Sequence, residues 1–83
     1  MNQQVVIIPT FNEIENIESI INSVFKLSTP FDILIVDDNS PDGTADKVIE
    51  LQSAFTERLH LLQRKNKKGL GTAYIDGFKY ALD

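Results

Sequence analysis

The residues that could do chemistry gather in three short polar segments of this 83-residue chain: residues 9–13 (PTFNE), 37–44 (DDNSPDGT) and 64–71 (RKNKKGLG). Carboxylates in the first two segments can accept hydrogen bonds from the N–H groups of a base and from sugar hydroxyls. Cations in the third can bind phosphate. A nucleotide with its phosphates would suit such a set of groups.

The first segment contains no glycine, so it is not the Gly-x-Gly-x-x-Gly turn of a dinucleotide-binding fold. Phe11 offers a ring face on which a base could stack, and Glu13 offers acceptors for a base or ribose. The alternative is that Phe11 packs in the core and that Glu13 only complements the positive end of the following helix.

The second segment begins with two adjacent carboxylates, Asp37 and Asp38. Neighbouring side chains of a strand point to opposite faces, so the two are not expected to hold one ion together. We expect one carboxylate to face a cleft and the other to organise the turn. Asp42 and Thr44 predict the turn and cap of the next helix, and the whole segment could be no more than an elaborate cap.

The third segment carries four of the eight basic residues of the chain, namely Arg64, Lys65, Lys67 and Lys68. They precede a glycine-led helix start at Gly69, where the backbone already presents positive charge. A bound phosphate would relieve that repulsion, and glycine would allow close approach to the backbone. The alternative is a solvated basic loop.

Three apolar runs predict strands at residues 4–9, 32–36 and 59–63, and each is followed by apolar residues at helical spacing, over 14–25, 45–55 and 70–82. Asn12 predicts the N-cap of the first helix, with Glu15 close to a capping box. The β-α-β-α-β-α order predicts an α/β fold with a parallel sheet between two helical layers. Because ligands bind at the carboxyl ends of parallel strands, the three polar segments should surround one cleft.

Composition removes several classes of function. Hydrophobic residues make up 42% and charged residues 24% of the chain, as in a single globular domain. The absence of cysteine and the single histidine, His60, exclude a disulfide scaffold, a thiolate zinc site and a multi-histidine metal site. A net charge of -4 argues against a general nucleic-acid binder.

The segments 6–13, 35–44 and 68–74, together with Gly77, resemble family 2 glycosyltransferases, and most closely the polyprenol-phosphate (dolichol-phosphate) mannosyltransferases. The resemblance covers nearly the whole chain, with the three blocks in the family's order. It implies a GT-A fold, whose nucleotide-binding half is Rossmann-like. It also implies transfer of a hexose, mannose from GDP-mannose, to a polyprenyl (dolichyl) phosphate.

The resemblance also assigns residues to the donor site. Those implied to bind the nucleotide sugar are Pro9, Phe11, Glu13, Val36, Asp37, Asp38, Lys68 and Gly69. The family commonly has tyrosine where Phe11 stands, so the stacking ring is kept and one hydroxyl is lost.

The family's Asp-x-Asp motif, which holds Mg²⁺ or Mn²⁺ on the donor diphosphate, does not occur in this sequence. We therefore expect residues 1–83 to be the N-terminal part of a GT-A catalytic domain. The metal ligands and catalytic residues would lie beyond Asp83, and the isolated chain would be inactive. The resemblance further implies a cytoplasmic protein, with association of the parent protein at the cytoplasmic face of a membrane.

Three other classes of protein are alternatives to this family. A nicotinamide dehydrogenase needs glycines after its first strand, and residues 9–13 have none. A phosphoacceptor receiver domain has its acidic pair after the first strand, whereas Asp37 and Asp38 follow the second. A non-catalytic nucleotide-binding or interaction module of the same Rossmann-like fold stays open as the alternative.

Overall fold

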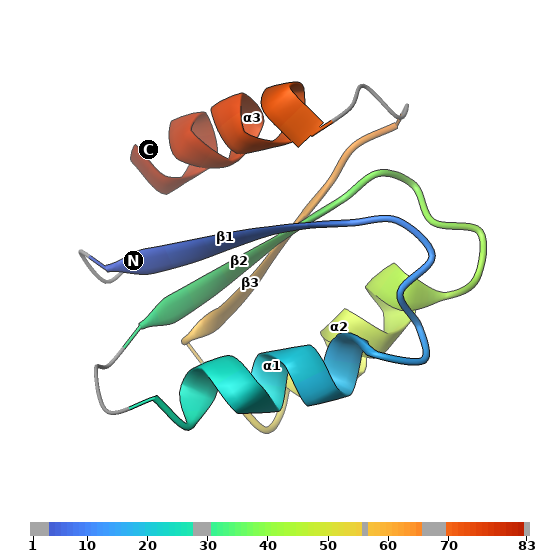
Figure 1. Cartoon of the computed structure of the whole chain (residues 1–83), viewed down its shortest axis with the longest axis vertical. Coiled ribbons are helices and arrows are strands. Elements are labelled where there is room, and N and C mark those ends of the chain that lie inside the picture. The colour runs from blue at the N-terminus through green and yellow to red at the C-terminus, as the bar shows by residue number, and fades with distance from the viewer. Residues whose placement is uncertain (1–3, 28–30, 56, 66–69, 83) are drawn as a thin grey trace.

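The computed structural model describes residues 4–27, 31–55, 57–65 and 70–82. The elements alternate as the sequence predicts (Figure 1), in the order β1 (Val5–Thr10), α1 (Ile17–Phe25), β2 (Asp32–Asp37), α2 (Thr44–Gln52), β3 (Leu59–Gln63) and α3 (Leu70–Leu82). The bounds of β3 and α3 agree with those predicted from the sequence.

The strands form a parallel sheet in the order β1-β2-β3. Residues of neighbouring strands pair one to one, so that Thr10, Asp37 and Gln63 lie side by side at the carboxyl edge. Every residue of β2 is buried, which explains its continuous apolar run: a central strand covered on both faces has no solvent side to alternate with.

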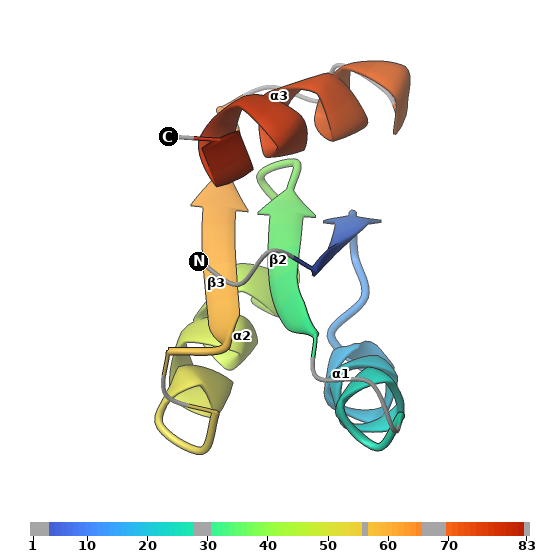
Figure 2. The same ribbon diagram turned by 90° about the vertical axis from the view of Figure 1, so that its left-hand side faces the viewer.

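Helices cover both faces of the sheet, so the predicted three-layer α/β/α arrangement is confirmed. Figure 2 shows α1 and α2 on one side of the strands and α3 on the other. The larger buried cluster lies between the sheet and the first two helices, and comprises Ile17, Ile21, Ile33, Ile35, Val48, Leu51 and Leu59. The smaller cluster, Leu34, Val36 and Ala73, lies under α3.

Gly77 lets α3 approach the sheet closely. A Cβ atom at this position would lie 2.8 Å from Cγ2 of Ile7 on β1 and 3.3 Å from Cγ2 of Val36 on β2. Since real side chains do not tolerate the first of these separations, the glycine sets the distance between helix and sheet.

Two local predictions are wrong. The first helix begins at Ile17 rather than after Asn12, and Asn12 instead has a left-handed backbone with φ of 56°. In α2, the helical spacing of apolar residues over 45–55 predicts a buried stripe that includes Ile49, but Ile49 is 51% exposed and Leu51 is buried instead.

Within the described part of the chain, no helix combines the length and the apolar character required to cross a bilayer.

Candidate functional site

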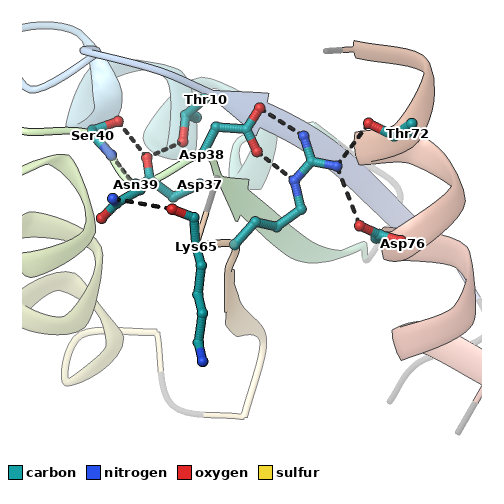
Figure 3. Close-up of polar contacts among 9 residues, drawn as sticks. Thr10, Asp37, Asp38, Asn39, Ser40, Lys65, Thr72 and Asp76 are labelled. Carbon is teal, nitrogen blue, oxygen red and sulfur yellow. Dashed lines mark hydrogen bonds and ion pairs between the residues drawn. The ribbon is translucent and has the colours of Figure 1, made fainter. Parts of the chain in front are cut away.

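The carboxyl ends of the three strands lie at the same edge of the sheet (Figure 1). Asp37 and Asp38, at the end of β2, turn to opposite faces there (Figure 3). Asp37 lies on the same face of the sheet as Ile35, which is covered by α1 and α2. Asp38 lies on the same face as Val36, which is covered by α3. The prediction that the two carboxylates diverge and that one of them organises the turn is confirmed, and the structure shows that this one is Asp37.

The Asp37 carboxylate is fully buried and ties β1 to the following turn. Its Oδ1 accepts hydrogen bonds of 2.7 Å from the hydroxyls of both Thr10 and Ser40, and its Oδ2 accepts one of 2.9 Å from the backbone N–H of Ser40. A carboxylate held by three donors within the chain acts as a structural centre of this edge.

The Asp38 carboxylate is bound by the guanidinium of Arg64, which follows β3. Nε of Arg64 donates to Oδ1, and Nη2 donates to Oδ2 at 2.6 Å. The two residues are 7% and 6% exposed. The hydrogen bond from Arg64 to Asp38 raises the pKa of the guanidinium, although burial opposes the shift, so Arg64 keeps its positive charge.

The same guanidinium reaches α3. Its Nη1 donates to the hydroxyl of Thr72 at 3.0 Å and to Oδ2 of Asp76 at 3.2 Å. Arg64 was expected in a basic loop for phosphate, and that prediction is wrong for this residue, because its side chain is buried and hydrogen-bonded to acceptors of the protein. Lys68 and Gly69, the two residues of this segment that were predicted to bind the donor, lie outside the described residues.

The loop after β1 is held against the loop after β2 by three consecutive backbone N–H groups. Those of Asn12 and Glu13 donate to the hydroxyls of Ser40 and Thr44, and that of Ile14 donates to Oδ2 of Asp42. The two loops are therefore one hydrogen-bonded unit, although 28 to 31 residues separate the partners.

Asp42 joins these loops to the start of α2, as predicted. Its Oδ1 accepts hydrogen bonds from the backbone N–H and the hydroxyl of Thr44, the first residue of that helix. Loss of water around this carboxylate would raise its pKa, but the hydrogen bonds from Thr44 and Ile14 outweigh that effect and the pKa of Asp42 lies below its ordinary value of 3.8.

The remaining predicted site residues lie around this unit. Phe11 is 38% exposed, so the alternative that its ring packs in the core is not supported. Glu13 and Pro9 are partly exposed. Val36 is fully buried in the cluster under α3, where its side chain supports the strand end from within. Contact of any of them with a nucleotide stays a prediction.

The residues present do not fit a divalent cation. Asp37 and Asp38 point apart, Asp37 already accepts three hydrogen bonds from within the chain, and the charge of Asp38 is paired with that of Arg64. Over the described ranges, no three Asp, Glu, His or Cys side chains group as metal ligands would. The part of the chain that the structure describes therefore has no metal centre.

Sequence reasoning missed two parts of the site. Arg64 was grouped with the lysines, and Asp76 was not considered. The strand register could have revealed the contact between Arg64 and Asp38. Gln63 pairs with Asp37, so the residues that follow them, Arg64 and Asp38, are also neighbours. This register is known only once the pairing of β2 with β3 is known, and the sequence pattern alone does not determine that pairing.

The model of the family described as Glycosyl transferase family 2 matches residues 5–83. The chain belongs to glycosyl transferase family 2. A protein from Mycolicibacterium smegmatis named polyprenol monophosphomannose synthase is 47% identical over 77 residues, which are 93% of this chain. An undecaprenyl-phosphate mannosyltransferase from Micrococcus luteus is 43% identical over the same share of this chain.

The fold is also that of a solved glycosyltransferase structure, the mannosyltransferase PcManGT from Pyrobaculum calidifontis in complex with GDP-Man and Mn²⁺. The match has a TM-score of 0.87 at 24% identity and covers 94% of this chain. The Rossmann-like GT-A prediction is thereby confirmed.

The chain spans only part of each of these proteins: 29% and 31% of the two curated relatives, and 24% of the solved structure.

Proposed function

We propose that this chain is the nucleotide-sugar-binding part of a glycosyltransferase that transfers mannose from GDP-mannose to a polyprenyl phosphate. Two relatives above 40% identity are named for mannose transfer involving polyprenol or undecaprenyl phosphate, and the structural neighbour holds GDP-Man. No observation favours the non-catalytic module over this assignment.

The observation that carries the proposal is the hydrogen-bonded edge of the sheet. Three strand ends meet there, and the loop with Phe11 and Glu13 is fixed to the loop with Asp38. On these joined loops, the exposed ring of Phe11 can stack on a base, and the carboxylates of Glu13 and Asp38 can accept its N–H groups. Such a preorganised surface lowers the entropy cost of binding.

The proposal assigns the metal and the acceptor to residues outside this chain. A divalent cation, when bound, would offset charge on the leaving diphosphate. The residues described here would hold the base and ribose, and they would do so without ligating that cation. Residues 1–83 would thus be the N-terminal part of the catalytic domain, and alone would transfer no sugar.

Isothermal titration of the 83-residue chain with nucleoside diphosphates tests the proposal. We expect GDP and GDP-mannose to bind more tightly than ADP, CDP or UDP at the same ionic strength, because Asp38 and Glu13 accept from the base. We also expect binding to persist when EDTA removes divalent cations. Equal affinity for all four nucleotides, or no binding of any, would contradict the assignment.

A further inference from the structure

The guanidinium of Arg64 links helix α3 to the residue that follows β2, Asp38. Arg64 donates to both oxygens of Asp38 and, from its other nitrogen, to Thr72 and Asp76 on α3 (Figure 3). Its side chain is only 4% exposed, whereas that of Asp76 is 32% exposed. The guanidinium therefore connects a solvent-facing carboxylate on the helix to a buried one at the strand end.

The Arg64 hydrogen bonds leave acceptor capacity on Asp38. A carboxylate has roughly four lone-pair positions, and the fork of Arg64 uses one on each oxygen. The remaining positions can accept N–H groups of a base, provided that the plane of the carboxylate is held at a fixed angle.

Asp38 does not fix that plane by itself, because the terminal torsion of an aspartate is broad and roughly two-fold. The planar fork of Arg64 fixes it, and Arg64 has a long side chain that needs an anchor of its own. Thr72 and Asp76 supply this anchor at Nη1.

From this geometry we propose that Asp76 and Thr72 are positioning residues of the nucleotide site, which act through Arg64 on Asp38. The inference rests on the proposed function and adds to it a coupling between α3 and base recognition. Base discrimination should then depend on a helix residue that does not itself touch the base.

The test is the ratio of the dissociation constants for UDP and GDP, measured by titration calorimetry on the 83-residue chain. We expect Asp76→Ala to lower this ratio by about threefold or more, because residues in one hydrogen-bonded network couple measurably. Asp76→Asn, which keeps an acceptor for Nη1, should lie between Asp76→Ala and the wild-type chain. Asp46→Asn makes the same charge change on the exposed side of α2 and should leave the ratio unchanged.

A second arm tests whether Asp76 acts through Arg64. In an Arg64→Lys background, where the planar fork is absent, Asp76→Ala should change the ratio no further. Thermal unfolding followed by circular dichroism identifies the variants that fold, and Asp76→Asn remains as the test should Asp76→Ala be unfolded.

The outcomes separate the two proposals. A wild-type chain that binds GDP preferentially, with the same preference in Asp76→Ala and Asp76→Asn, would overturn this inference and leave the proposed function intact. Lower thermal stability in these variants with an unchanged ratio would show a purely structural role and would also overturn it. A wild-type chain that binds no nucleotide would overturn both.

Discussion

At the scale of single residues, the site depends on two adjacent carboxylates with different tasks. Asp37 is fully buried and gathers Thr10 and Ser40, and Asp38 lies beside Arg64. The alternation of side chains along a strand is sufficient to separate them. One carboxylate can therefore hold the loops in place while its neighbour remains available for recognition.

Replacing Asp37 with asparagine should lower the free energy of unfolding by about 2 kcal/mol or more. The two carboxylate oxygens accept three hydrogen bonds, whereas an amide has only one acceptor oxygen, so at least one donor would lose its acceptor. Urea denaturation at neutral pH measures the change. Asp46→Asn is the matched control and should shift the free energy by less than about 0.5 kcal/mol. Equal midpoints for the two variants would mean that Asp37 is not the structural centre of this edge.

At the scale of elements, the sequence predicted the strands and α3 well, because β-branched runs and helical spacing are local signals. It misplaced the start of α1, where Asn12 has the type and spacing of an N-cap. In the structure, the N–H groups of residues 12–14 bond to side chains of the next loop instead. Those partners are distant in sequence, as are the groups around Arg64, so no local pattern could reveal them.

The contact between α3 and the sheet gives a prediction for Gly77. Alanine would gain about 1 kcal/mol of helix propensity, but its Cβ would clash with Cγ2 of Ile7, at a cost of about 1–3 kcal/mol. We expect Gly77→Ala to lower the urea midpoint. The loss should shrink in an Ile7→Ala background, which lacks Cγ2, and persist in an Ile7→Val background, which keeps it. Equal losses in both backgrounds would show that this contact does not set the helix position.

At the scale of the whole molecule, one layered α/β unit brings the three strand ends to one edge and has no metal centre within the residues that the structure describes. The chain spans 29% and 31% of the length of the two curated relatives. The proposed function assigns nucleotide binding to this chain, so binding can be measured on the 83 residues directly.

The most direct test of the central claim is amide chemical-shift mapping of the ¹⁵N-labelled 83-residue chain during titration with GDP-mannose. We expect the largest shifts at residues 10–13 and 37–40, whose loops form the hydrogen-bonded edge. A surface hollow on the exposed side of α1 provides an internal comparison, and it is lined by Glu15, Glu18, Ser19, Asn22, Ser23 and Lys26. Shifts confined to that hollow, or no saturable shifts at the strand ends, would contradict the account.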